Sequence, residues 1–227
     1  MTATPAPIPA AREAVVGLCR DLVERGLVVG TAGNVSVREG DLVAVSPSGM
    51  AYTELVADDV CVHELDGTPV STPLRTTSEL ALHSLVHSRP GAEPGEVVLH
   101  THAPASTALS TVADEVPLTH YYSEFFGGAV RVAPYRRFGT DALAEVVLAA
   151  LQDRSAALMG NHGAILISKT AGAALDRAAY LEYVCDIALR AMATGRPLRT
   201  LDPEEIEEVR AGLAGYGQPR PHRGERR

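Results

Sequence analysis

The chain has 227 residues and a formal net charge of −8 at pH 7, so it can bury a substantial core, and its charge argues against nucleic acid as a partner. We expect a single domain over residues 1–217 and a disordered, Pro- and charge-rich tail over residues 218–227. The sequence has no apolar run of about 18 residues and no signal-peptide pattern, which predicts a cytoplasmic protein without a membrane partner. Its three cysteines have no C-x-x-C spacing and are expected to be reduced.

The first part of the chain predicts a helix followed by antiparallel strands. Apolar residues recur at helical spacing over residues 11–28, and strands are expected over residues 35–38, 42–45 and 59–65. The small residues of Gly30–Asn34 precede the first strand, where exposed backbone amides can hold an anion. The same pattern is also compatible with an ordinary turn.

A helix is predicted from about Thr76 to Ser88, and its first turn carries polar residues with alternative roles. Thr77 and Ser78 offer hydroxyls beside free amides at a helix N-terminus, a combination that suits a phosphate group. Glu79 either completes a capping box or serves as the carboxylate of a site. The position in the sequence leaves both alternatives for Glu79 open.

The same helix contains a competing candidate for a metal site. Glu79, His83 and His87 are spaced at i, i+4 and i+8, which places them on one face of the helix. We rank this trio below the histidines that follow in the sequence. His83 and His87 are interpreted instead as packed, hydrogen-bonded residues.

His100 and His102 follow a short apolar strand predicted over residues 97–99. Residues i and i+2 of a strand point to the same side, so both imidazoles can reach one ion. Pro104 ends the strand and suits the first turn of a helix over residues 105–112. An isolated H-x-H pair is equally compatible with two solvated side chains, so it is weak evidence alone.

His162 is the third candidate ligand. It lies in a tight Asn-His-Gly turn between apolar strands predicted over residues 156–159 and 164–167. Three imidazoles with an open coordination position suit a catalytic zinc or a similar divalent ion. We therefore predict that His100, His102 and His162 form a metal centre.

The remaining elements complete an α/β fold. Residues 115–128 contain an aromatic patch that is expected to pack in the core, with one phenol available for a site. A strand is expected over residues 130–133, and helices over residues 141–151, 170–194 and 203–213. Because hairpins dominate while strands interleave with helices, we predict a three-layer α/β/α fold with a mostly antiparallel central sheet and helices on both faces.

Six motifs occur in the order and approximate spacing found in the class II aldolase and adducin family. The chain resembles this family, and within it the L-fuculose-1-phosphate aldolases, from about Ala11 to Pro197. The motifs are G-T-A-G-N-V-S-V-R, S-P-S-G-M-A-Y, T-S-E-L-A-L-H, H-T-H-A-P, A-P-Y-R-R-F-G-T and G-N-H-G. Together they are specific for the family and much less specific for the substrate.

The resemblance implies a metal centre and a phosphate-binding site at defined positions. His100, His102 and His162 match zinc ligands, and another divalent ion such as Mn²⁺ or Co²⁺ could replace zinc. Glu79 matches the acid/base carboxylate, which can also touch the metal. The positions that match phosphate-binding residues are Asn34, Ser48, Gly49, Thr77 and Ser78.

The resemblance also implies that the site is completed by aromatic residues and by a second subunit. Tyr121 matches a tyrosine that protonates the departing aldehyde oxygen, and Phe138 matches an aromatic residue on the aldehyde side. The family forms homotetramers with sites between subunits, and Tyr216 is the candidate that covers a neighbour's site. Residues 122–126 are bulkier than expected of a fuculose-type enzyme, which leaves the identity of the aldehyde open.

The implied activity is metal-dependent cleavage of a 1-phospho-2-ketose, of the L-fuculose 1-phosphate type, to dihydroxyacetone phosphate and a small aldehyde such as L-lactaldehyde. One alternative is an L-ribulose-5-phosphate 4-epimerase, although the epimerases carry Asp where this chain has Glu79. A related sugar-phosphate dehydratase or decarboxylase is another. A non-enzymatic adducin-like binding module is the third, although such domains lack the full set of ligands that is present here.

Overall fold

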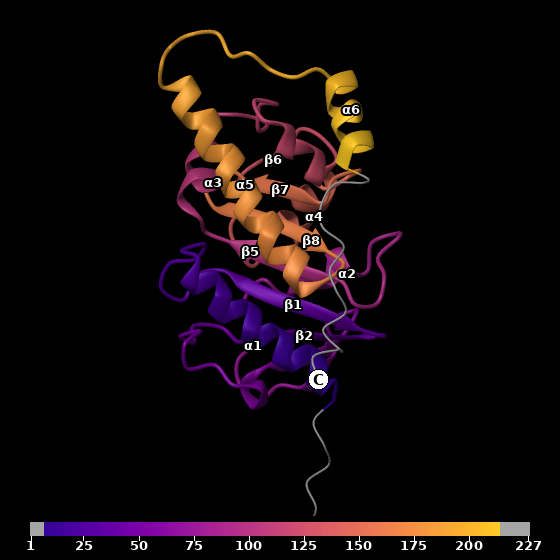
Figure 1. Ribbon diagram of the computed structural model, residues 1–227. Helices are drawn as coiled ribbons and strands as arrows, with labels where there is room; N and C mark the ends of the chain where they lie inside the picture. The colour runs from indigo at the N-terminus through magenta and orange to yellow at the C-terminus, as the bar shows by residue number, and fades with distance from the viewer. Residues whose placement is uncertain (1–6, 214–227) are drawn as a thin grey trace, which may run out of the picture.

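The computed structural model describes residues 7–213 and is built around one central sheet of eight strands (Figure 1). The order of the strands across the sheet is β4-β3-β2-β1-β5-β8-β7-β6. Two expectations, the C-terminal tail and the covering residue Tyr216, lie outside the described residues. Within residues 7–213, no helix combines the length and the apolar character needed to cross a bilayer.

Neighbouring strands run antiparallel everywhere except between β6 and β7. The mostly antiparallel sheet predicted from the hairpins is therefore confirmed. The strands are β1 (Asn34–Glu39), β2 (Leu42–Val45), β3 (Cys61–Glu64), β4 (Pro69–Ser71), β5 (Val97–Thr101), β6 (Val132–Ala133), β7 (Ala156–Met159) and β8 (Gly163–Ser168).

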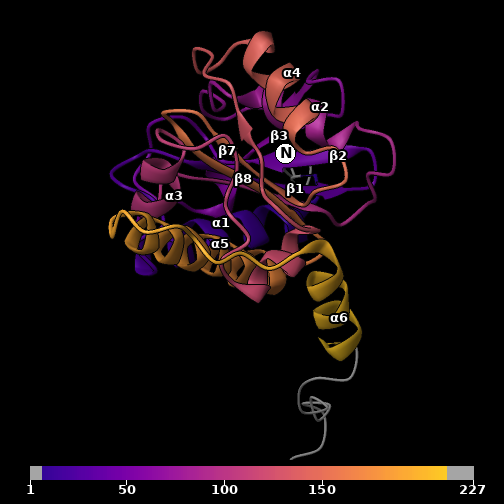
Figure 2. The same cartoon turned by 90° about the horizontal axis from the view of Figure 1, so that it is seen from above.

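Helices cover both faces of the sheet, which confirms the three-layer architecture. On one face α1 and α5 pack side by side with α3 next to α5, and on the other face α2 packs against α4 (Figure 2). The α-helices are α1 (Pro9–Glu24), α2 (Leu80–His87), α3 (Pro104–Leu109), α4 (Asp141–Ala150), α5 (Ala171–Met192) and α6 (Pro203–Leu213). Two short 3₁₀ helices, η1 (Ala57–Asp59) and η2 (Tyr121–Phe126), lie in the connections.

The alternation of side chains along β5 divides the core into two layers. Val97 and Leu99 pack in the core beneath α1 and α5, whereas Val98 packs in the core beneath α2 and α4. His100 has the same parity as Val98, so its side chain lies on the face that α2 covers. The strand pattern therefore directs the first histidine toward the N-terminal end of α2.

The structure corrects several element boundaries. The first helix ends at Glu24 rather than at residue 28, because Gly26 adopts φ +67 and its N–H and that of Leu27 bond back to the last turn. The helix predicted from Thr76 begins only at Leu80. The edge strand β4 and the helix η2 were not predicted, since both are short and lack a clear periodicity.

The β7–β8 hairpin brings its turn against the end of β5. Asn161 in this turn adopts φ +55, and Gly163 begins β8 directly after His162. A Cβ atom on Gly163 would lie 2.2 Å from the carbonyl oxygen of Thr101. Only glycine therefore lets the turn approach β5 closely enough to place His162 near His100.

Replacing Gly163 with alanine is expected to lower the free energy of unfolding by about 1–3 kcal/mol, because the added methyl group must displace backbone. The matched control is Gly172→Ala in the first turn of α5, where nothing lies within 4 Å of the new Cβ. That variant is expected to be as stable as the wild type or slightly more stable. Urea denaturation measures both, and equal losses in the two variants would contradict the close-approach argument.

Candidate active site

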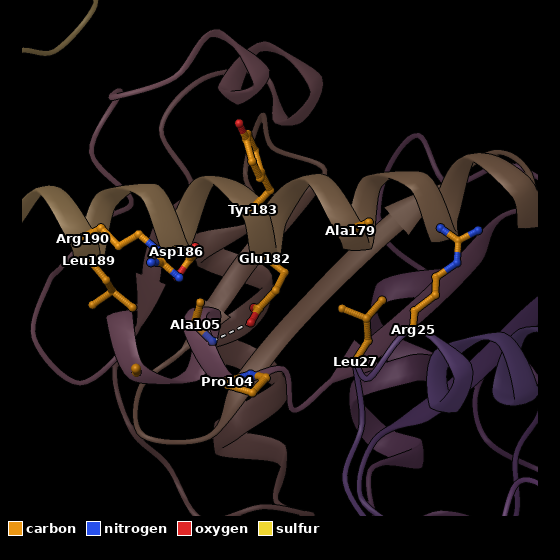
Figure 3. Close-up of a pocket in the computed structure, with 11 residues that line it drawn as sticks. Arg25, Leu27, Pro104, Ala105, Ala179, Glu182, Tyr183, Asp186, Leu189 and Arg190 are labelled. Atoms are coloured by element: carbon orange, nitrogen blue, oxygen red, sulfur yellow. Dashed lines mark hydrogen bonds and ion pairs between the residues drawn. The ribbon is translucent and has the colours of Figure 1, made fainter.

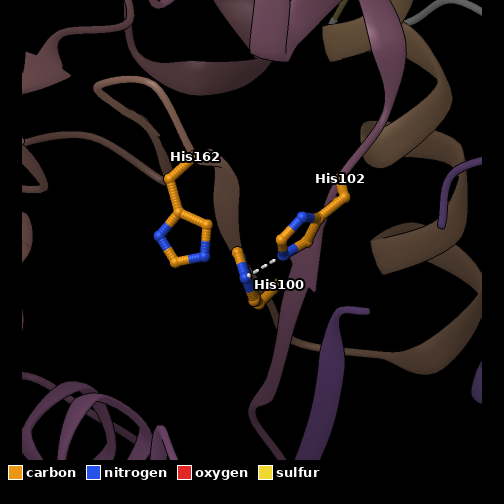
Figure 4. A group of neighbouring side chains, drawn as sticks. All are labelled: His100, His102 and His162. Atoms are coloured by element: carbon orange, nitrogen blue, oxygen red, sulfur yellow. Dashed lines mark hydrogen bonds between the residues drawn. The ribbon is translucent and has the colours of Figure 1, made fainter. Parts of the chain in front are cut away.

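Three histidines from two distant parts of the sequence converge at the end of β5 (Figure 4). His100 is in β5, His102 follows it, and His162 lies in the β7–β8 turn. Their ring centroids are 4.6–4.9 Å apart, and one potential ligand atom from each lies within 4.8 Å of the others. Among the described residues this is the one group of three His, Cys, Asp or Glu side chains that converges in this way.

The histidine cluster has the chemistry that a divalent ion requires. His100 is fully buried, and its Nδ1–H donates to the carbonyl of Ala164 at 2.9 Å, which leaves Nε2 as the nitrogen facing the cluster. The Nε2 atoms of His100 and His102 are 2.8 Å apart. Burial is the main cause that lowers the pKa of His102 to about 4 and also lowers the pKa of His162. Neutral imidazoles are the form that binds zinc, so the residues fit such an ion.

Glu79 lies beside the cluster and is buried. Its Oε2 is 3.2 Å from Nε2 of His100 and accepts a 2.8 Å hydrogen bond from Nδ2 of Asn34. Its Oε1 is 3.8 Å from Nε2 of His162 and has no hydrogen-bond partner among the described residues. Burial alone would raise the pKa of Glu79, but His100, the Asn34 amide and His162 outweigh it and hold the pKa below its usual value.

The capping interpretation of Glu79 is wrong. Glu79 occupies the N-cap position of α2, yet its side chain makes no capping hydrogen bond and turns toward the histidines. The alternative helical metal trio is not assembled either. His83 and His87 are fully buried, and the hydroxyl of Ser36 lies 2.6 Å and 2.7 Å from their ring nitrogens.

A pocket of about 270 Å³ opens next to the cluster, and its lining residues come from six separate segments of the chain. The five residues predicted to bind phosphate all line it, together with Phe138, Glu79 and two of the histidines. No Lys or Arg is among its lining residues within the part of the chain that the structure describes. The lining is Thr31, Ala32, Gly33, Asn34, Pro47, Ser48, Gly49, Thr77, Ser78, Glu79, His102, Phe138 and His162.

Gly33 holds one wall of this pocket close to the histidines. It adopts φ +84, and a Cβ atom there would lie 2.7 Å from Cγ1 of Val28 and 2.8 Å from the carbonyl oxygen of His100. The buried hydroxyl of Tyr52 donates to the Gly33 carbonyl at 2.7 Å. Tyr52 was not assigned a role from the sequence, because its partner is 19 residues away and no local pattern connects them.

In its own chain, Tyr121 lies in a different pocket from the clustered histidines. Its side chain is 42% exposed and stacks on His120 with ring centroids 4.5 Å apart. It lines a different pocket, of about 490 Å³, between η2 and α6. Of the aromatic patch, only Phe126 is fully buried in the core as expected.

A larger cavity lies elsewhere, along α5 (Figure 3). This groove of about 820 Å³ runs between α5 and the start of α3, and residues such as Arg25 and Tyr183 line it. The Glu182 carboxylate accepts the backbone N–H groups of Ala105 and Ser106 at 2.6 and 2.9 Å, so it stabilises the N-terminus of α3. None of the three clustered histidines lines the groove, so cavity size does not locate the site.

The chain is similar to known aldolases over most of its length. A family model described as the class II aldolase and adducin N-terminal domain matches residues 13–189. The 5-deoxy-D-ribulose 1-phosphate aldolase of Bacillus thuringiensis is 34% identical over 91% of this chain and 97% of that protein. The L-fuculose phosphate aldolase of Escherichia coli is 34% identical over 89% of this chain and 94% of that protein. The solved structure of an L-fuculose 1-phosphate aldolase matches with a TM-score of 0.85 and 27% identity, over 94% of this chain and all of that chain.

The buried histidines of α2 predict that the protein loses stability in acid. Burial lowers the pKa of His87 to about 3, whereas an unfolded histidine titrates near 6.5. As the pH falls below about 6.5, His87 is protonated in the unfolded chain but stays neutral in the folded protein. This favours the unfolded state and lowers the free energy of unfolding. The loss of unfolding free energy from this one group reaches roughly 2 kcal/mol at pH 5.

The variant His87→Gln tests this, because its amide can replace the ring Nε2 against Ser36 without titrating. Urea denaturation between pH 7 and pH 5 is expected to show a shallower loss of stability for the variant than for the wild type. Parallel losses in the two proteins would show that His87 does not carry the effect.

Proposed function

The chain belongs to the class II aldolase and adducin family, and we propose that it is a zinc-dependent aldolase that cleaves a 1-phospho-2-ketose to dihydroxyacetone phosphate and a small aldehyde. The observation that carries the proposal is the convergence of three imidazoles, a buried carboxylate and a polar pocket in one place. The substrates named for the relatives, L-fuculose phosphate and 5-deoxy-D-ribulose 1-phosphate, support a reaction on a phosphorylated ketose.

The pocket supports binding of the phosphate by neutral donors. Ser48, Gly49, Thr77 and Ser78 line it and carry hydroxyl and backbone N–H groups, of which the N–H of Ser48 already donates to the carbonyl of Arg75. Thr77 and Ser78 stand just before Glu79, the N-cap residue of α2. The positive end of the helix dipole and such donors suffice to hold a phosphate without a cationic side chain. Asn34 can add only its second amide proton, because the first already bonds to Glu79.

The three histidines are the residues that would hold the ion. A zinc ion bound there would act as a Lewis acid. It would stabilise the negative charge that develops on the ketone oxygen as the C3–C4 bond of the ketose breaks. Mn²⁺ or Co²⁺ could serve in the same nitrogen donor set. His100 contributes orientation as well, because its bond to Ala164 fixes both the ring and its tautomer.

Glu79 is the residue proposed to move the proton. Its lowered pKa keeps the carboxylate ionised at neutral pH. Glu79 lines the pocket, and its unpartnered Oε1 is buried 3.8 Å from Nε2 of His162. When the carbon–carbon bond breaks, the three-carbon fragment must take up a proton at its electron-rich carbon. In the reverse direction the ionised carboxylate can accept this proton from the carbon. In cleavage Glu79 must first take up a proton, which the C4 hydroxyl releases as it becomes the aldehyde carbonyl, and it can then deliver a proton to the carbon.

The aldehyde end of the site is proposed to include a neighbouring subunit. Phe138 lines the pocket and is 61% exposed, so it can contact the aldehyde directly. Tyr121 lies in a separate pocket of its own chain, so we propose that a homotetramer supplies it, with Tyr216, to the site of an adjacent copy. There its hydroxyl would lie beside the C4 oxygen and would relay the proton that leaves this oxygen in cleavage, as the C4 hydroxyl becomes the aldehyde carbonyl, and that returns to it in the reverse direction.

The epimerase, dehydratase and decarboxylase alternatives would use the same metal centre, and no contact in the structure favours them. An adducin-like binding module does not require this centre. The convergence of all three histidines with Glu79 therefore favours an enzyme over a module.

The decisive experiment supplies the zinc-loaded protein separately with L-fuculose 1-phosphate, 5-deoxy-D-ribulose 1-phosphate and L-ribulose 5-phosphate. Coupling to glycerol-3-phosphate dehydrogenase detects dihydroxyacetone phosphate, which is expected from at least one of the two 1-phosphates. Formation of D-xylulose 5-phosphate from the third substrate alone would make the protein an epimerase. Silence on all three with one zinc bound per chain would contradict the proposal.

Glu79→Gln is expected to lower kcat at least about 100-fold, because the amide can keep the contact with Asn34 but cannot transfer a proton. Zinc content measured by mass spectrometry and thermal stability should stay close to the wild type. Glu54→Gln, at an exposed carboxylate outside the pocket, is the matched control and should be fully active. Near-normal turnover by Glu79→Gln would remove Glu79 from the acid/base role.

A further inference from the structure

A chain of buried hydrogen bonds runs beneath Glu79 along the contact between β1 and α2. Asn34 and Ser36 are two residues apart on β1, so their side chains point to the same face of the sheet. His83 and His87 are four residues apart on α2 and point toward them. All four side chains are at most 5% exposed, so solvent does not compete for these hydrogen bonds.

The direction of each hydrogen bond in this chain is set by the carboxylate at its end. An ionised Glu79 only accepts, so Asn34 must present Nδ2 to it and therefore presents Oδ1 to the ring of His83. His83 must then carry its proton on Nε2, which leaves Nδ1 to accept from the hydroxyl of Ser36. The Ser36 oxygen in turn accepts from Nε2–H of His87.

Every group in the series therefore donates toward Glu79. The series begins with Nε2–H of His87 and ends on Oε2 of Glu79. The second polar atom of each end group, Nδ1 of His87 and Oε1 of Glu79, has no hydrogen-bond partner among the described residues. A buried cluster that only filled space would have no reason to leave its two ends open and share one direction. A series of donors with one direction strengthens each successive bond and favours negative charge at its acceptor end.

We propose that His87, Ser36 and His83 are positioning residues, which lock the amide of Asn34 in one orientation and through it aim the Glu79 carboxylate at the pocket. The proposal rests on the proposed function, in which Glu79 transfers the proton. It goes beyond that function because none of the three residues lines the pocket. It also gives Asn34 a second role, orienting Glu79, in addition to its proposed role in the phosphate-binding site.

The first test reads the tautomers directly, without turnover. Two-bond ¹H–¹⁵N correlation spectra of the ¹⁵N-histidine-labelled protein are expected to show Nε2–H for His83 and His87, and Nδ1–H for His100. His83→Gln and His87→Gln assign the two signals by their disappearance. Nδ1–H at either His83 or His87 would overturn the proposal, because the direction of the series would then be broken.

The second test separates positioning from a purely structural role. Ser36→Ala is expected to lower kcat roughly 10-fold per zinc-loaded site, with KM for the sugar phosphate unchanged within about two-fold. Ser168→Ala is the matched control, since this buried strand hydroxyl has no partner within the described residues, and it should match the wild type. His87→Leu should resemble Ser36→Ala, whereas His87→Gln should recover most of kcat because its amide can still donate to Ser36.

The outcomes distinguish this proposal from the proposed function. Correct tautomers in a protein that turns over no sugar phosphate would contradict the aldolase activity and retain the hydrogen-bond series. Normal aldolase activity with kcat equal in Ser36→Ala and Ser168→Ala would overturn the positioning role and retain the aldolase.

Discussion

The register of β5 between β1 and β8 is the constraint on which the site depends. Antiparallel pairing places Asn34 opposite His100 on one side and Ile165 opposite His100 on the other. The same β8 register carries the His162 turn to the end of β5. A slip by one residue in either pair would turn the polar side chains to the opposite face of the sheet and disperse the donors. Apolar side chains cover both faces of the sheet, and each set is packed against its own layer of helices. A slip would move each set to the opposite layer, so this packing opposes it.

Burial makes the polar groups of this region act as a unit. Asn34, Ser36, Glu79, His83 and His100 sit between strands and a helix, away from water. An unpaired polar group in such surroundings costs about 1–3 kcal/mol, so the hydrogen bonds between them leave little freedom in where each side chain points. Two atoms at the ends of the network have no partner among the described residues, Nδ1 of His87 and Oε1 of Glu79, and the second belongs to the residue proposed to transfer the proton. A rigid network that leaves one oxygen of Glu79 unpartnered suits proton transfer better than a flexible carboxylate would.

The sequence predicted the layers of the fold and the three histidines, since both follow from local periodicity and from strand-end positions. It did not decide the role of Glu79, because a residue at the start of a helix has the same local signature whether it caps the helix or faces a site. It also missed the contacts of Ser36 and Tyr52, whose partners are 47 to 51 and 19 residues away. Such contacts depend on how α2 lies over β1, which no short motif encodes. The end of α1 was misplaced because the apolar pattern continues past Gly26.

The two outer strands of the sheet bear on how copies of the chain can associate. The edge strand β4 has three residues and begins with Pro69, which has no N–H to donate, and the opposite edge strand β6 has only two residues. Neither border offers a long row of free backbone groups, so joining sheets edge to edge across two molecules is disfavoured. Among the residues that the structure describes, helical surfaces and loops are therefore the better candidates for contact between copies. An association of that kind would leave the sheet of each copy intact, so a second copy would not alter the strand register that builds the pocket.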